Sequence, residues 1–195
     1  MATKLEIFNM AIGQVGGTRM ATLGDTHTES VLLNENYATI LDEILAMKDW
    51  GFARKVAPVA KTVDPAIADR AVYAIPSDCV LLRQVGEDQY VDNEDNIDWT
   101  IENNLIFIDG GATTMYLRYT KRETDTTKFS APFVTPLILR LAMQICIPIS
   151  ANVKVYDLLT KAWGGFLQDA GSSDGSQGKA RKIRNGQLIR ARLSQ

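Results

Sequence analysis

The chain has 195 residues, of which 46% are hydrophobic, enough for one globular domain with an elaboration or for two small domains. Its formal net charge is −2, and its two cysteines, Cys79 and Cys146, lie far apart without a C-x-x-C partner, which favours reduced thiols in an intracellular setting over a disulfide scaffold. No apolar run reaches the roughly 18 residues that a membrane span needs, and Lys4 and Glu6 argue against an N-terminal signal peptide.

The first predicted element is a helix that begins at a T-x-x-E capping box at residues 3–6 and ends at Gly16-Gly17. A second box at residues 26–29 predicts a longer helix that ends near residues 50–52. Its apolar residues recur at three- and four-residue steps, which indicates one buried face. This stripe consists of Leu33, Tyr37, Ile40, Ile44 and Met47.

Short runs rich in β-branched and aromatic residues follow Pro65 and predict strands. Asn103-Asn104 has the length and composition of a two-residue hairpin loop, and residues 109–111 mark the next turn. We therefore expect a small antiparallel meander made of residues 79–85, 99–102, 105–108 and 114–119.

Helical signals return at Thr135-Pro136, where a cap precedes a proline in the first turn. The helix that follows is apolar almost all round and should be central, with Pro148 as its limit. A last helix is predicted over residues 152–170, weakened by Gly164-Gly165.

These elements predict an α+β protein that is mainly α, namely a four-helix bundle with an inserted small antiparallel β meander and an extended C-terminal arm. Residues 1–70 and 129–170 should form the helical bundle domain, residues 71–128 the inserted β subdomain, and residues 171–195 the basic arm.

Signals for catalysis or for a bound cofactor are weak. His27 is the only histidine, so a histidine-based triad or a multi-histidine metal site has no basis. The acidic run 92–98 lacks the glycine and the glutamate that an EF-hand loop needs at its sixth and twelfth positions. No phosphate-binding glycine loop is present in the sequence. We expect no catalytic, cofactor-binding or metal site, although an unrecognised pair of carboxylates stays an alternative.

The C-terminal segment 171–195 has six cations and one acid, Asp174, and so carries +5, which leaves −7 on residues 1–170. A Gly/Ser-rich entry and few apolar residues give this segment no core of its own. It suits a protein groove or sheet edge, a phosphate backbone without base stacking, or a solvated end. The candidate binding residues are Lys179, Arg181, Lys182, Ile183, Arg184, Leu188, Ile189, Arg190, Arg192 and Leu193.

Several stretches, in order along residues 3–170, together resemble the head-to-tail adaptors, or tail tubular protein A family, of short-tailed phages. The opening helix at residues 5–13 and the paired helices over 137–150 and 153–170 are similar to those of the family. Two short motifs carry most of the resemblance: a W-x-F-A-R motif and a tyrosine–proline–aspartate entry into the β region. Their residues are Trp50, Phe52, Ala53 and Arg54, then Tyr73, Pro76 and Asp78.

The resemblance implies a structural virion protein, without catalysis or cofactor, that is assembled in the host cytoplasm and sits in the virion neck. It implies a ring, typically a dodecamer, between the portal protein and the tail nozzle or tail tube, with genomic DNA passing through its channel and no membrane contact. The helices would form the ring wall, the β insertion would project toward a neighbour, and the arm would reach along the portal. The alternative is a DNA-binding packaging or head-completion accessory protein that uses its basic tail.

Overall fold

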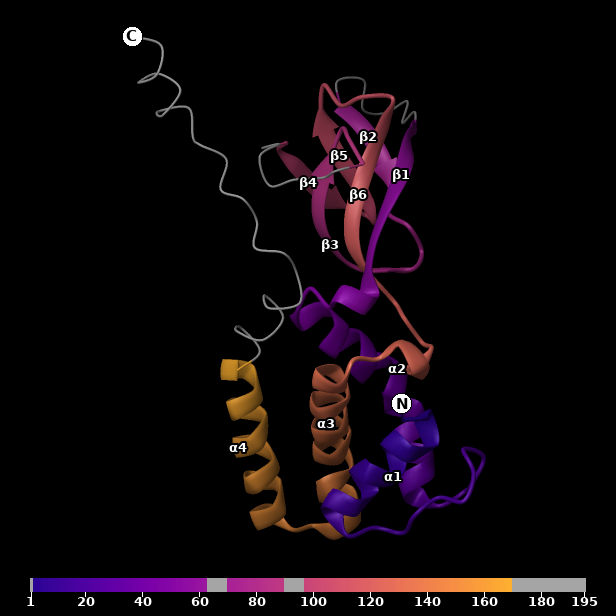
Figure 1. The fold of residues 1–195 in the computed structure, drawn as a ribbon, viewed down its shortest axis with the longest axis vertical. Coiled ribbons are helices and arrows are strands. Elements are labelled where there is room, and N and C mark those ends of the chain that lie inside the picture. The colour runs from indigo at the N-terminus through magenta and orange to yellow at the C-terminus, as the bar shows by residue number, and fades with distance from the viewer. Residues whose placement is uncertain (1, 63–69, 90–96, 170–195) are drawn as a thin grey trace.

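The structure is a computed structural model that describes residues 2–62, 70–89 and 97–169. In Figure 1 four helices form one end of the molecule and a six-stranded sheet forms the other. The helices are α1 (Lys4–Val15), α2 (Thr28–Met47), α3 (Ala131–Ser150) and α4 (Val153–Asp169). The strands are β1 (Arg54–Thr62), β2 (Arg70–Ala74), β3 (Cys79–Gly86), β4 (Trp99–Glu102), β5 (Leu105–Asp109) and β6 (Thr114–Lys121).

The predicted fold class is wrong: the β part is no small meander, and the helices do not form a four-helix bundle. All six strands join one antiparallel, nearly closed, barrel-like sheet in the order β3-β6-β1-β2-β5-β4. Helix α3 packs against α1, α2 and α4, whereas α4 packs chiefly on α3 and lies at the outside of the group (Figure 1). The described fold therefore has two parts of comparable size. One consists of three packed helices with a fourth at their side, and the other is the barrel-like sheet.

Strands β1 and β2 are the elements that the sequence reading missed. Residues 54–62 carry a proline and several cationic residues, a composition that argues against a strand in the middle of a sheet. Pro58 is tolerated because β1 pairs with β6 from Arg54 to Ala60 but with β2 only at Lys61 and Thr62. At Pro58 the far side of β1 thus has no strand partner among the described residues, so the missing N–H costs little.

The β4–β5 hairpin confirms the predicted two-residue loop. Glu102 lies opposite Leu105, and Asn103 and Asn104 have φ angles of 50° and 61°. Both values lie in the left-handed region that a type I′ turn requires, where asparagine is tolerated better than most residues. At the next turn Gly110 has a φ of 68°, as its place after Asp109 suggested.

The predicted helix ends are partly right. Helix α1 has the full capping box, with Thr3 Oγ1 accepting from the Glu6 amide at 3.2 Å, and it ends at a left-handed Gly16. The box predicted at residues 26–29 does not form, because α2 begins at Thr28 and the Glu29 carboxylate turns to the loop before it.

The predicted limits of α3 are also wrong. The helix begins at Ala131 and continues to Ser150, with Pro136 and Pro148 inside it. Each proline lies near an end and removes one bond of the helical ladder. The packing of the apolar helix against its neighbours outweighs both losses.

Helix α3 is long and apolar enough to cross a membrane, with a mean hydropathy of 1.7 over its best window. A helix of this kind was not expected from the sequence. The same properties suit the central helix of a packed group. Here α3 contacts three helices, and its Arg140 donates to the Glu43 carboxylate of α2 at 3.0 Å.

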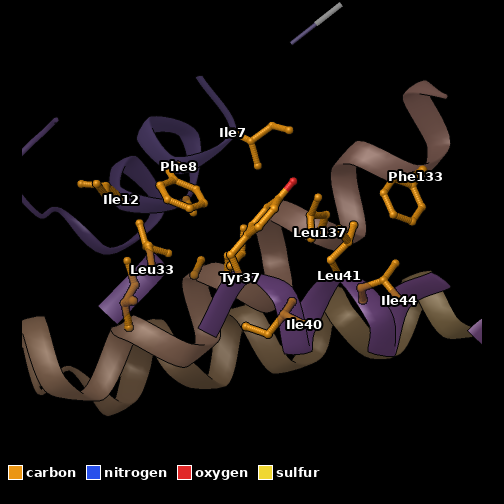
Figure 2. Close-up of a cluster of buried hydrophobic side chains, with 14 of the residues drawn as sticks. Ile7, Phe8, Ile12, Leu33, Tyr37, Ile40, Leu41, Ile44, Phe133 and Leu137 are labelled. Carbon is orange, nitrogen blue, oxygen red and sulfur yellow. The ribbon is translucent and has the colours of Figure 1, made fainter. Parts of the chain in front are cut away.

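The apolar side chains form two separate cores. The helical core holds the buried faces of α1, α2 and α3 (Figure 2), and it includes Ile7, Phe8, Leu33, Ile40 and Leu137. The barrel core is lined by inward residues of the strands, among them Tyr73, Leu82, Ile106, Met115, Leu117 and Tyr119. Each part thus has its own apolar interior, and their relative orientation depends on the contacts between them.

Tyr37 offers a test of the helical core. Its ring packs edge-on to Phe8 at 5.4 Å, but its hydroxyl is buried without a hydrogen-bond partner among the described residues, and burial raises its pKa to about 12. An unpaired buried hydroxyl costs free energy. Tyr37→Phe should therefore leave the free energy of unfolding unchanged or raise it by up to about 1 kcal/mol. The matched control is Tyr119→Phe, because the Tyr119 hydroxyl donates to Asp78 at 2.8 Å and its loss should destabilise. Urea unfolding of both variants checks this, and a Tyr37→Phe loss equal to that of Tyr119→Phe would contradict it.

Glu29 predicts a dependence of stability on acid. Its buried carboxylate accepts from the Thr18 amide at 3.0 Å, and this hydrogen bond lowers its pKa from 4.5. Because the folded pKa is the lower one, the contribution is complete above about pH 4.5 and is lost as the pH falls through the folded value. Glu29→Gln should therefore have a lower free energy of unfolding than wild type at about pH 7, and this difference should become smaller at about pH 3.5. Urea unfolding of both proteins at the two pH values measures the difference. The same difference in free energy of unfolding at both pH values would show that ionisation of Glu29 does not stabilise the fold.

Candidate functional site: the junction between helices and barrel

The W-x-F-A-R residues form the connection from α2 into the barrel. Trp50 and Ala53 are buried, and the Trp50 indole N–H donates to the Ile44 carbonyl of α2 at 2.9 Å. The Phe52 ring, in the short 3-10 helix Gly51–Ala53, lies 4.9 Å from that of Phe133. These contacts fix the direction in which the chain leaves the helices. The aromatic cluster consists of Trp50, Phe52, Phe129 and Phe133.

Asp49 is the centre of an ion network at the same place. Its carboxylate accepts from Arg54 at 3.0 and 3.2 Å and also from Arg118 of β6. The other terminal nitrogen of Arg118 donates to Gln84 of β3 at 2.6 Å. One acidic side chain after α2 therefore connects to β1 directly and to β6 and β3 through one guanidinium, with charge-assisted bonds of the stronger kind.

Arg83 of β3 makes a second connection to α2. Its guanidinium donates to the carbonyls of Ala46 and Lys48, at 2.9 and 2.8 Å, and its Nε donates to Thr120 of β6 at 3.0 Å. The last carbonyls of a helix have no partner within the helix and carry partial negative charge, so a cation is stabilising there. Burial lowers the pKa of Arg83, but an arginine keeps its charge at neutral pH.

The return connection from β6 to α3 is also tied to α2. Arg122, just after β6, donates to the Asp42 carboxylate with two nitrogens, one at 2.7 Å. Beyond it the buried Glu123 carboxylate binds Lys121 at 2.7 Å and Lys128 at 3.1 Å. Both covalent crossings between the two parts are thus held by ion pairs.

Two residues of the second motif, Pro76 and Asp78, lie at the helix-facing side of the barrel. Asp78 accepts from Lys55 at 2.7 Å and from the Tyr119 hydroxyl at 2.8 Å, and the Lys55 bond is the main cause of its lowered pKa. Pro76 begins the turn that places Asp78, with the Cys79 amide bound to its carbonyl at 2.9 Å. Tyr73 lies in the barrel core toward the end away from the helices, where its hydroxyl donates to the Ala112 carbonyl just before β6. Pro76 and Asp78 therefore order the helix-facing end of the barrel, and Tyr73 orders the other end.

The ion pairs of the junction join α2 and the segment after it to the strands and to Arg122, just after β6. The ionisable groups of the junction are engaged with one another, and the described residues hold no group of three or more histidine, cysteine or acidic side chains that could bind a metal ion. A hollow of about 420 Å³ beside it is lined by Met47, Trp50, Arg83 and the end of α4. We find no arrangement of nucleophile and base there.

The most exposed large apolar side chains of the described residues lie on α4 and near the end of α3. Val153 and Leu158 of α4 are 63% and 65% exposed, and Ile147 of α3 is 47% exposed. A groove of about 370 Å³ between α1 and α3 is lined in part by Met10, Ile138 and Leu139. These surfaces are available for contact with another protein.

The candidate arm residues, Lys179 to Leu193, lie outside the described residues, as does the acidic run 92–96. No protein-family model and no curated protein matches the chain.

The sequence reading missed most of the junction. Asp49 directly precedes Trp50 of the W-x-F-A-R motif. This position, an acidic residue just before the aromatic residue that follows the helix, was the one sequence signal for Asp49. Arg83 and Arg118 lie in predicted strands, and their partners Lys48 and Asp49, just after α2, are 35 and 69 residues away along the chain. A pairing between elements so distant leaves no local pattern.

Proposed function

We propose that this protein is a structural virion adaptor that assembles as a ring between a portal and the tail, with residues 171–195 as the segment that docks on the portal. The resemblance to phage head-to-tail adaptors is the basis of this proposal. The junction supports it, because the W-x-F-A-R residues and Asp78 meet where the helices join the barrel.

A subunit of a DNA channel has to keep its shape under load, and the junction suits that need. Asp49, Arg83 and Arg122 connect α2 to the barrel through three independent side-chain contacts. The helices and the barrel then orient as one unit, so a partner that binds one part also positions the other.

The charges also favour this role. Residues 1–170 carry −7 and the arm carries +5. A negative wall repels packaged DNA, and a cationic arm with four arginines among its six cations can form bidentate pairs with acidic residues of a partner. The exposed apolar residues of α3 and α4 offer a surface for contacts between neighbouring subunits.

The test is deletion of residues 171–195, followed by co-sedimentation with the portal. We expect docking to be lost while the circular dichroism spectrum keeps its helical signal. Equal docking of the truncated and full-length proteins would contradict the role of the arm. A matched variant away from α3 and α4, Lys61→Glu with Arg70→Glu at exposed positions of β1 and β2, should dock like wild type.

A DNA-binding accessory role is the second candidate, and the density of cations in the arm is the feature that favours it. It predicts arm-dependent DNA binding whose affinity falls with salt by a slope of about −0.9 per phosphate contact. Salt titration of duplex binding separates the two, since an adaptor with a portal-binding arm should bind DNA weakly.

A further inference from the structure

The free edge of β4 is the least protected edge of the barrel. Among the described strands β4 pairs only with β5. The opposite edge, β3, has register shifts between Cys79 and Leu81 and between Leu82 and Gln84, and the free side of β1 carries Pro58. Bulges and prolines are the usual devices against strand addition. β4 has neither, and its pairing with β5 is regular throughout.

The backbone of β4 presents hydrogen-bonding groups at this edge. In an antiparallel pair, residues alternate between pairs that exchange hydrogen bonds and pairs that do not, and the pair that flanks a two-residue turn is a bonded one. Glu102 and Thr100 therefore bond to β5. The N–H and C=O groups of Trp99 and Ile101 point away from it, toward the free edge.

The two faces of β4 differ in chemistry. Trp99 and Ile101 stand opposite Ile108 and Ile106, which belong to the barrel core, so they lie on the inner face. Ile101 is nonetheless 46% exposed, because no described strand lies beside it. The outer face carries Thr100 and Glu102, with Asp98 just before the strand. Both acids are exposed, and neither forms an ion pair within the described residues.

The arm contains a segment with the complementary pattern. After Leu188 in residues 188–193 (LIRARL), the apolar Ile189, Ala191 and Leu193 alternate with Arg190 and Arg192. Alternation of this kind is typical of a strand with one apolar and one polar face. Added beside β4, it would place aliphatic side chains next to Ile101, with one arginine opposite Asp98 or Glu102 and the other opposite Thr100, diagonal to the second acid.

We propose that in the free subunit residues 188–193 of the same chain add to the β4 edge as a further strand of the barrel. The 18 residues from 170 to 187 can span up to about 60 Å when extended, more than enough for a chain of this size. Edge β3 suits the segment less well, because it is bulged and its Arg83 adds positive charge. The inference concerns the subunit before assembly and does not rest on the portal, which would bind the arm in competition with β4.

Amide hydrogen exchange of the full-length protein, followed by NMR, tests the proposal. The amides of Trp99 and Ile101 should be protected in wild type and should exchange about tenfold faster in the variant Arg190→Glu with Arg192→Glu. Protection should return when Asp98→Arg and Glu102→Arg are added to that variant. The matched control, Lys179→Glu with Lys182→Glu, makes the same change in charge and should leave both amides protected.

Two results would overturn the proposal. Rates for Trp99 and Ile101 that are the same in wild type and in the Arg190/Arg192 variant would show that the segment is not at this edge. Protection that falls on dilution would show that the added strand comes from a second copy of the chain.

Discussion

Trp50→Ala should lower the free energy of unfolding by about 3–5 kcal/mol, the usual cost of emptying a large aromatic site in a core. The side chain is 1% exposed, it lies 5.1 Å from Phe133 in an edge-to-face contact, and its N–H satisfies the Ile44 carbonyl. The alanine variant loses the packing and leaves that carbonyl without this partner.

Urea unfolding of Trp50→Ala measures this loss, with Trp163→Ala as the matched control. Trp163 is only half-buried, on α4, and packs on Phe166 at 5.5 Å, so its removal should cost clearly less. Equal losses at the two tryptophans would mean that the aromatic cluster contributes little to joining the two parts.

Asp49→Ala should have the second largest effect, with a loss of about 1–3 kcal/mol, because charge-assisted hydrogen bonds to Arg54 and Arg118 disappear together. Arg118 is only 21% exposed and, within the described residues, would keep its bond to Gln84. The barrel should also become freer to change its orientation, which residual dipolar couplings of the two parts detect.

Asp109→Ala is the control for that experiment. Asp109 also pairs with an arginine, Arg70, at 3.1 Å, but its side chain is 80% exposed, so its removal should change stability by less than about 0.5 kcal/mol. If Asp49→Ala and Asp109→Ala had the same free energy of unfolding and the same residual dipolar couplings, the junction would not set the orientation of the barrel.

Local patterns were enough to predict the elements with clear punctuation. The Thr3–Glu6 box, the Gly16 end of α1 and the Asn103-Asn104 turn all depend on residues close together in sequence, and each forms as expected. Strands β3 to β6, predicted from short runs rich in β-branched and aromatic residues, were also found within a residue or two.

The elements that the sequence reading missed depend on tertiary context. Strand β1 forms although it contains Pro58, because β6 pairs with one side of β1 and the missing N–H of Pro58 falls on the other side. Helix α3 runs through two prolines because its apolar surface is buried on several sides. With β1 and β2 unrecognised, the barrel looked like a small insertion, and the bundle looked larger than it is.

Part of the junction lies at residues that the resemblance had singled out, whereas the ion network around them was not predicted. Trp50, Arg54 and Asp78 were selected from a resemblance, and the structure places them at the junction. Their partners, Arg83, Arg118 and Tyr119, come from strands that are far away in sequence, so the network became visible only with the fold.

Electron microscopy of the full-length protein mixed with a phage portal protein tests the central proposal most directly. The proposal predicts a ring of this chain on the tail-facing end of the portal, with density for residues 171–195 against the portal surface. A mixture in which the portal stays bare, at concentrations where the protein is folded, would contradict it.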